Sequence, residues 1–212
     1  MLFGKVLNKK QKSLIKRLVF LNKYRCYLAG GTSLALQIGH RTSLDFDFYT
    51  HKHFNSQELA DLFRKEFNKV TFGNIAKDTL FVDIDEVNLS LFYYPYKLIK
   101  GTSVYEGIEL ASLPDIAAMK VAAVVQRGVR RDFIDIYYLL RMFTLEEIIN
   151  FALKKFPTFQ SMIILKALIY FTDAEEEDLK RGIMIFDKDF SWKRVKAEIL
   201  TEVRKYQLDL LK

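Results

Sequence analysis

Hydrophobic and polar residues alternate along the chain with two different periods, and the change of period divides the chain into two parts. In the first part, apolar residues recur at helical spacing over residues 7–23 and 56–69, with charged residues between them, which predicts two amphipathic helices. A shorter apolar helix is expected over residues 32–38, closed by Gly39. Strands are predicted over residues 25–29, 44–49, 79–84 and 87–94, the last two forming a hairpin.

Beyond residue 110 the pattern is helical to the end of the chain. Ser112 and Asp115 have the spacing of a capping box, which predicts the start of a helix that is interrupted at Gly128. Further helices are expected over residues 131–142, 145–156, 161–170 and 192–210. The sequence has three prolines and no Ser/Gly-rich stretch, so we expect the two parts to be tightly joined.

This order of elements predicts an α+β fold. We expect a mixed β-sheet core with flanking helices over residues 1–110 and a helical C-terminal half over residues 111–212 that packs on that core. Hydrophobic residues make up 50% of the chain and aromatic residues 14%, which is enough for a folded core and excludes a disordered chain.

Composition also bears on where the protein works. The longest apolar runs, such as residues 163–171, are interrupted by Lys166 and are too short to span a membrane. The N-terminus becomes basic where a signal peptide would need its apolar stretch, and the single cysteine, Cys26, lies in an apolar run typical of a buried residue. We therefore expect a cytoplasmic protein with no membrane partner.

The net charge is +7, and the excess positive charge is concentrated in two places. A basic balance favours polyanionic partners such as nucleic acid or nucleotide phosphates, although many basic proteins bind neither. The two clusters are Lys9, Lys10, Lys12, Lys16 and Arg17 in the first segment, and Arg127, Arg130 and Arg131 in the second half.

Two aspartates, Asp45 and Asp47, alternate with Phe46 and Phe48 on a predicted strand. Residues two apart on a strand share a face and stand roughly 6.7 Å apart. At an effective dielectric constant of about 20, two carboxylates at that distance repel each other by roughly 2.5 kcal/mol. Either the pair faces water on an edge strand, or a hard cation such as Mg²⁺ or Mn²⁺ lies between the two and relieves the repulsion.

The segment before the acid pair favours the metal. Gly30 and Gly31 follow a strand and precede a helix. Because glycine has no Cβ atom, no side chain covers their backbone N–H groups, which form an anion-binding nest suited to phosphate. Thr32 and Ser33 supply hydroxyls at the same turn, where they also have the residue types of an N-cap. A phosphate nest joined by one short helix to a metal-binding acid pair suits a nucleoside triphosphate (NTP) with its metal ion.

Two further residues lie just before the acid strand. Arg41 can bind a triphosphate through both arms of its guanidinium group, or it can pair with a surface acid. Ser43 shares a strand face with Asp45 and is placed to orient the acids.

The run GGTSLALQIGHRTSLDFDFY, residues 30–49, resembles the signature of the polymerase-β-like nucleotidyltransferase superfamily, in which Gly-Gly and a short helix precede Asp-x-Asp. Its finer form resembles the AbiEii/AbiGii toxin-type nucleotidyltransferase family. Similar segments continue over residues 92–99, 111–140 and 167–179, so the resemblance covers nearly the full length.

The resemblance implies a nucleotidyltransferase-like fold and an enzyme that uses an NTP with Mg²⁺ or Mn²⁺. It also implies the toxin of a toxin–antitoxin or phage-defence system, with a cognate antitoxin protein as partner. Some relatives transfer nucleotides onto tRNA ends, so the acceptor is expected to be a hydroxyl of RNA, including tRNA, or of a protein.

The resemblance places Lys120 facing the nucleotide, as a third catalytic residue beside the two aspartates; otherwise its ammonium group reaches the surface from an apolar helix. Residues 127–135 match a further family segment. Asp132 and Asp135 lie near a helix N-terminus, where negative charge is favourable in any case. With Arg127 and Arg131 they are expected to form an ion-pair network that lines the cleft and contacts phosphate.

Many members of the superfamily carry a third carboxylate on a neighbouring strand, and the alignment places that position at Ser90. Asp83 is the better substitute metal ligand, because Asp85 belongs to the predicted turn. Two alternatives to transfer therefore stay open. The chain is either a weak or inactive nucleotide- or RNA-binding module of the same fold, or a phosphodiester hydrolase with the same metal site.

Overall fold

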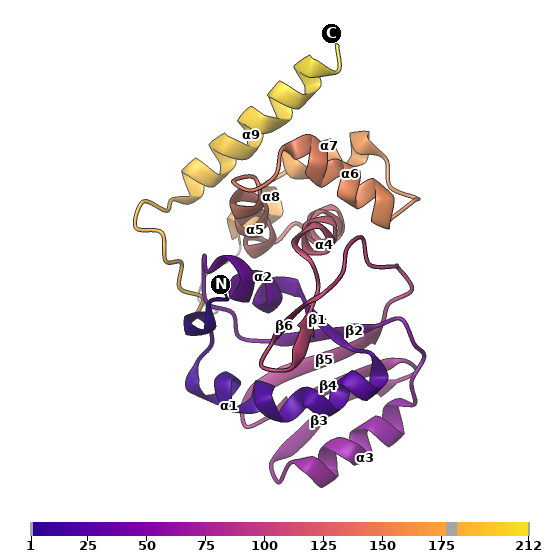
Figure 1. Cartoon of the computed structure of the whole chain (residues 1–212). Coiled ribbons are helices and arrows are strands. Elements are labelled where there is room, and N and C mark those ends of the chain that lie inside the picture. The colour runs from indigo at the N-terminus through magenta and orange to yellow at the C-terminus, as the bar shows by residue number, and fades with distance from the viewer. Residues whose placement is uncertain (1, 177–181, 212) are drawn as a thin grey trace. The chain divides into compact units, whose positions relative to one another are not determined.

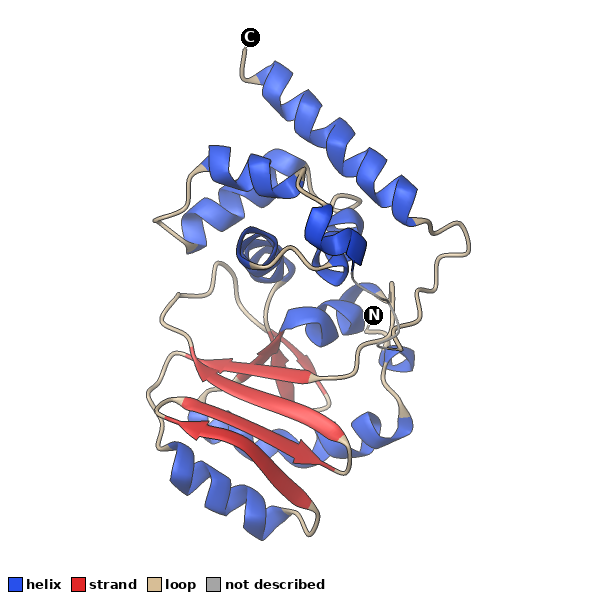
Figure 2. Ribbon diagram, turned by 180° about the vertical axis from the view of Figure 1, so that it is seen from behind, coloured by secondary structure: helices blue, strands red, loops and turns tan. Residues whose placement is uncertain are grey.

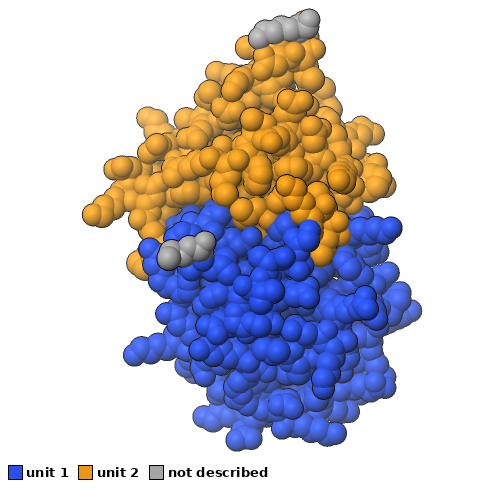
Figure 3. All heavy atoms as spheres, in the orientation of Figure 1, with its two compact units in different colours: residues 1–97, 101–112 blue, residues 98–100, 113–212 orange. Residues whose placement is uncertain are grey.

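The computed structural model of the chain describes residues 2–176 and 182–211, so the end of the acidic run at residues 173–178 lies outside the described residues. The chain divides into two compact units (Figure 3). Unit 1 is Met1–Lys97 with Gly101–Ser112, and unit 2 is Leu98–Lys100 with Leu113–Lys212. The assignment of a separate core domain over residues 1–110 and a helical region over residues 111–212 stays a prediction.

Unit 1 contains a seven-stranded mixed sheet in the order β3-β4-β5-β2-β1-β7-β6 (Figure 1). At its centre β2 runs antiparallel to β1 on one side and parallel to β5 on the other. The described strands are β1 (Tyr27–Ala29), β2 (Phe46–Thr50), β3 (Val70–Ala76), β4 (Thr79–Ile84), β5 (Val87–Tyr93), β6 (Ser103–Tyr105) and β7 (Ile108–Leu110).

The helices of unit 1 bury one face of the central strands. Phe46 and Phe48 of β2 are fully buried, whereas Asp47 and Tyr49, which alternate with them, are partly exposed on the opposite face. Helix α3 packs against β3 and β4 and lies behind the sheet in Figure 2. The helices are α1 (Lys9–Arg17), α2 (Gly30–Ile38) and α3 (Ser56–Glu66), with short 3₁₀ helices at Gly4–Val6 and Leu18–Tyr24.

Unit 2 is helical, and α4 lies at its centre, in contact with α5, α6 and α7. Most of α4 is apolar and buried, which explains its position. Its described helices are α4 (Leu113–Gln126), α5 (Arg130–Leu139), α6 (Leu145–Lys155), α7 (Ser161–Leu168), α8 (Thr172–Glu176) and α9 (Trp192–Asp209).

The predicted fold class, a mixed sheet with flanking helices and a helical C-terminal half, is confirmed. Cys26 is buried as expected, and burial raises the pKa of its thiol to about 12. Among the described helices, none combines the length and the apolar character that crossing a membrane requires.

Several local predictions were wrong. The first helix ends at Arg17 and continues as a 3₁₀ turn, whose three-residue period places Leu18 and Leu21 on one buried face. Helix α3, capped by Asn55, ends at Glu66 instead of residue 69. Strand β3 was missed because Gly73 and a register shift beside it interrupt the alternation of apolar residues.

Candidate functional site

The candidate phosphate nest is formed where β1 turns into α2. The helix begins at Gly30, two residues earlier than the sequence predicts, with Ala29 as its N-cap. The predicted capping role of the Thr32 and Ser33 hydroxyls was therefore wrong. Gly30 has a φ of 65°, a left-handed conformation that costs a glycine little. The N–H groups of the first turn of α2 have no partner within the helix and can bind an anion.

Neighbouring side chains leave little room for a Cβ atom at either glycine. A Cβ atom on Gly30 would lie 2.8 Å from Oδ2 of Asp47, because Ala29 pairs with Asp47 across β1 and β2. A Cβ atom on Gly31 would overlap the guanidinium group of Arg41 and lie 3.4 Å from Oγ of Ser43. The nest, Asp47 and Arg41 are therefore immediate neighbours in space.

Hydrogen bonds hold the start of α2 to the segment before β2. The hydroxyl groups of Thr32 and Ser43 are 2.8 Å apart, and Thr32 also donates to the carbonyl oxygen of Asp45. Gln11 of α1, which is fully buried, donates to the carbonyl oxygens of Ser43 and Leu44 at 2.9 and 3.0 Å. Thr32 and Ser43 thus position the acid strand relative to the nest.

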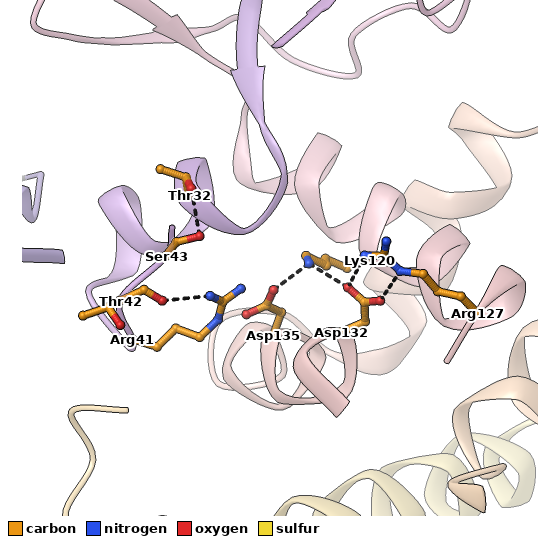
Figure 4. A network of polar contacts seen from close by, with 8 residues as sticks. All are labelled: Thr32, Arg41, Thr42, Ser43, Lys120, Arg127, Asp132 and Asp135. Carbon is orange, nitrogen blue, oxygen red and sulfur yellow. Dashed lines mark hydrogen bonds and ion pairs between the residues drawn. The ribbon is translucent and has the colours of Figure 1, made fainter. Parts of the chain in front are cut away.

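Ser33 and Thr32 make different contacts, although both hydroxyl groups belong to the same turn. Ser33 is fully buried, and its Oγ accepts a hydrogen bond of 3.1 Å from Gln37, one helical turn later. Arg41 is also buried and donates to the carbonyl oxygen of Thr42 at 2.9 Å (Figure 4). That Ser33 and Arg41 bind the nucleotide stays a prediction.

The two acids are each contacted by a polar residue of β5. Asp45 lies immediately before β2, and its Oδ1 accepts a hydrogen bond of 3.2 Å from Asn88. Asp47 pairs in register with Ser90, whose hydroxyl donates to Oδ1 of Asp47 over 2.6 Å. Two carboxylates beside a hydroxyl are oxygen ligands of the kind that Mg²⁺ and Mn²⁺ prefer, so the residues present fit a hard divalent cation.

Asp83 has a local role in the structure. It lies on β4, opposite Asn88 of β5, and its Oδ1 accepts a hydrogen bond of 3.1 Å from the backbone N–H of Glu86 in the turn. Within residues 2–176 and 182–211 there is no cluster of three His, Cys, Asp or Glu side chains arranged to hold a metal ion. A metal-binding role for Asp83 stays a prediction.

In unit 2, Lys120 of α4 forms two short ion pairs with α5. Its Nζ lies 2.8 Å from Oδ1 of Asp132 and 2.7 Å from Oδ2 of Asp135 (Figure 4). The lysine side chain is 8% exposed and both aspartates are fully buried. Arg127 contacts Asp132 through Nε at 2.9 Å and Nη2 at 3.3 Å.

This network keeps the Asp132 carboxylate charged in the interior of unit 2. Burial alone would raise the pKa of Asp132, but Lys120 and Arg127 together hold it below its usual range. The sequence predicted the ion pair between Arg127 and the aspartates, but it did not predict that Lys120 is their shared partner. The side chain of Arg127 is 57% exposed, so it reaches solvent while it contacts the network.

The arginines of the second basic cluster make different contacts. Arg130 donates to the carbonyl oxygens of Ala174 and Glu175, both at 2.8 Å, and its guanidinium lies over the ring of Trp192. Arg131 lies beside it in the first turn of α5 and is partly buried. A phosphate contact by Arg127 or Arg131 stays a prediction.

A sequence model of a protein family covers most of the chain. The family is described as nucleotidyl transferase AbiEii toxin, type IV toxin–antitoxin system, and its matches span residues 18–88 and 77–205. The chain belongs to this family. It is a nucleotidyltransferase, and the recognition made from the Gly-Gly and Asp-x-Asp signature is confirmed.

Individual proteins are similar to this chain in sequence or in fold. An uncharacterized protein of Aquifex aeolicus (strain VF5) is 35% identical over 209 residues, which cover 94% of this chain and 97% of that protein. The crystal structure of JHP933 from Helicobacter pylori has a TM-score of 0.60 at 17% identity and covers 100% of this chain and 99% of its own. MenT4, a nucleotidyltransferase toxin from Mycobacterium tuberculosis H37Rv, has a TM-score of 0.51 at 12% identity, with 91% of this chain and 82% of its own covered. Both structural likenesses show the shared fold.

Sequence reasoning missed two residues of the candidate site and one contact of a third. Gln11 and Asn88 contact the acid strand from α1 and β5, and no local pattern marks either residue. The position of Ser90 was predicted by alignment, but its hydrogen bond to Asp47 depends on the parallel pairing of β2 with β5. A pattern of alternating residues shows which face a side chain is on and leaves the neighbouring strand unknown.

Proposed function

We propose that this AbiEii-family chain transfers a nucleotidyl group from an NTP to a hydroxyl group of RNA, including tRNA, in the cytoplasm. Its role is that of the toxin in a toxin–antitoxin or phage-defence pair, opposed by a cognate antitoxin. The single observation that supports this reaction is that the phosphate nest lies directly beside the acid pair. The space left by the missing Cβ of Gly30 is bordered by the carboxylate of Asp47.

In this proposal the first turn of α2 binds the phosphates of the NTP through its backbone N–H groups. Gly30 and Gly31 leave that turn without side chains, so a phosphate can approach the backbone beside Asp47. Arg41 adds positive charge next to Gly31. A divalent cation held by Asp45 and Asp47 would neutralise phosphate charge at the reacting centre.

The bond changes follow from this placement of the triphosphate. The acceptor hydroxyl attacks the α-phosphorus in line with the bond to the leaving group and gives its proton to an aspartate carboxylate or to solvent. The bond from the α-phosphorus to the bridging oxygen breaks, that oxygen takes the electron pair, and pyrophosphate departs. Ser90 and Asn88 hold the two carboxylates in fixed orientations through their hydrogen bonds.

For unit 2 we propose a phosphate-binding role on the exposed side of the ion-pair network. Arg127 supports this, since its guanidinium is tethered to Asp132 and still more than half exposed. Lys120, Asp132 and Asp135 would keep Arg127 and the start of α5 in place, and Arg131 lies in the same first turn of α5. This assignment makes Lys120 a positioning residue, in place of the catalytic role that the resemblance implies.

The test is to incubate the protein with each α-labelled NTP, Mg²⁺ or Mn²⁺ and total bacterial RNA. The Asp45→Asn/Asp47→Asn variant removes the acid pair, and the Glu58→Gln/Asp61→Asn variant removes two exposed acids of α3 as a matched control. We expect label to enter RNA with the wild type and the control, and not with the acid-pair variant.

Other outcomes would replace the proposal. Label in protein instead of RNA would change the acceptor class, and release of free nucleotide without incorporation would indicate hydrolysis. Nucleotide binding without turnover would support a binding module, an alternative that the serine in place of a third acid favours.

A further inference from the structure

A groove of about 400 Å³ opens beside the acid pair, on the face of the sheet opposite α3. Figure 2 views the sheet from this side, which we call the acid face. Asp47 of β2, Ser90 of β5 and Phe81 of β4 pair in register across three adjacent strands, so they form one row on the acid face. The groove follows this row away from the acid pair towards β3.

The groove lies on the side of the acid pair that an acceptor must use. The nest follows β1, which borders β2 on one side, whereas the groove lies over β5 and β4 on the other side. In-line displacement places the attacking hydroxyl opposite the leaving pyrophosphate. With the triphosphate at the nest, the acceptor therefore approaches across β5 and β4.

Phe81 is the feature of the groove that points to a nucleobase. Its side chain is 40% exposed, although its neighbours Leu80 and Val82 are buried. Its ring meets Phe92 edge to face at 5.4 Å between centroids, which fixes its orientation. A Cβ atom on Gly73 of β3 would lie 3.4 Å from the Cβ atom of Phe81, so the absence of a side chain there leaves space for a flat group beside the ring.

The groove shares lining residues of β3 and β4 with a cavity beside the basic helix α1. Thr71 and Asp83 line both this groove and a second cavity, which is also lined by Lys10 and Arg17. Arg17 in turn borders a third cavity, together with Lys12 and Lys16. Asp85 and Glu86 also line the second cavity, and Lys10 pairs with Glu86. In the third cavity Lys16 also pairs with an acid, Glu106, at 3.7 Å, but Lys12 and Lys16 are both exposed and can reach a phosphate in solvent.

We propose that the groove and α1 form the docking track for a single-stranded 3′ end of RNA. A terminal base stacks on Phe81, the terminal hydroxyl lies at the acid pair, and the preceding phosphates run towards Lys12 and Lys16. This inference rests on the proposed function and names the path of its acceptor. Stacking on an exposed aromatic ring combined with a basic path for the backbone is how proteins bind single strands without sequence preference.

The test measures binding of a labelled hairpin RNA with an unpaired 3′ tail, compared with the same hairpin without the tail, in the absence of NTP. Phe81→Ala should weaken binding of the tailed RNA about tenfold and leave the blunt RNA unchanged. Phe81→Trp keeps an aromatic surface and should retain binding. Tyr170→Ala removes a comparably exposed ring of unit 2 and serves as the control.

The charges of α1 are tested through salt dependence. Lys12→Ala/Lys16→Ala should reduce the slope of log affinity against log salt by about 1.4, since each contact to a single strand contributes about 0.7. Lys65→Ala/Lys193→Ala removes two exposed lysines outside the track and should leave the slope unchanged.

Binding and transfer together separate this inference from the proposed function. Tail-dependent binding that requires Phe81, without any transfer, would support the track and reject the reaction. Transfer to RNA with unchanged binding and an unchanged KM for RNA in Phe81→Ala would reject the track and keep the reaction. Equal affinity of the wild type for tailed and blunt RNA, or no affinity for either, would also overturn the track.

Discussion

Ser90 on β5 donates a hydrogen bond of 2.6 Å to the carboxylate of Asp47 on β2, at the point where the two strands run parallel in register. The position is the one where the superfamily resemblance places a third carboxylate. A serine hydroxyl can orient Asp47 and offers a neutral oxygen, but it adds no charge to the site. The orientation of Asp47 therefore depends on Ser90, as that of Asp45 depends on Asn88.

Ser90→Ala should lower the affinity for Mn²⁺ roughly tenfold, because loss of a residue that orients a metal ligand typically has this effect. The free energy of unfolding should fall by only about 1 kcal/mol, the contribution of one hydrogen bond. Calorimetric titration with Mn²⁺ measures the affinity, and Ser103→Ala on β6 is the control for an exposed strand serine. Equal affinities for all three proteins would show that Ser90 does not position Asp47.

Gly30→Ala should damage both stability and nucleotide binding. The left-handed φ of 65° costs a residue with a Cβ about 1–2 kcal/mol, and the new methyl group would press on Oδ2 of Asp47. Urea unfolding and NTP binding by fluorescence measure the two effects. Gly101→Ala is the matched control, because a Cβ atom there meets nothing within 4 Å. If Gly30→Ala binds NTP like Gly101→Ala, phosphate does not use this turn.

The nest and the acid pair could be predicted from the sequence because both are local. Gly-Gly before a helix and aspartates two residues apart specify their geometry over a few residues, whatever the rest of the chain does. Thr32 shows the limit of such local reasoning. Its residue type suggested an N-cap, but in the structure its hydroxyl bonds to Ser43 and to the backbone of Asp45.

Long-range contacts account for what the sequence did not reveal. Asp115 was interpreted as part of a capping box, yet it is fully buried and pairs with Lys155, 40 residues later, at 2.8 Å. Its two oxygens also accept hydrogen bonds from the backbone N–H groups of Ile99 and Lys100, which assigns residues 98–100 to unit 2. An acid near a helix N-terminus has a sufficient local explanation, so nothing in the pattern indicates a distant lysine.

Asp132→Asn should destabilise the protein by about 3 kcal/mol near neutral pH, because it leaves Lys120 with one buried carboxylate in place of two. The pKa of Asp132 is lower in the folded chain than in an ordinary carboxyl. Its stabilising effect is therefore complete above its unfolded pKa, near 4, and is lost as the pH falls through its lower folded pKa. Urea unfolding between about pH 6 and 3 should show the difference between wild type and variant shrinking on acidification. A difference that stays constant over this range would contradict the lowered pKa.

The Asp115–Lys155 pair should show strong coupling in a double-mutant cycle, since both side chains are fully buried. Asp115→Leu alone should cost about 3–5 kcal/mol because the ammonium group loses its carboxylate. Lys155→Met should cost less, since Asp115 keeps the hydrogen bonds from Ile99 and Lys100.

The double variant removes both charges but leaves those two N–H groups without their acceptor, at a cost of about 1–3 kcal/mol for each group that stays buried. It should therefore be more stable than the sum of the single effects implies, yet less stable than the wild type. The same cycle on the exposed pair Asp61–Arg64 should give a coupling of about 0.5 kcal/mol. Additive effects at Asp115 and Lys155 would mean that the two charges do not stabilise each other and that unit 2 relaxes around either one.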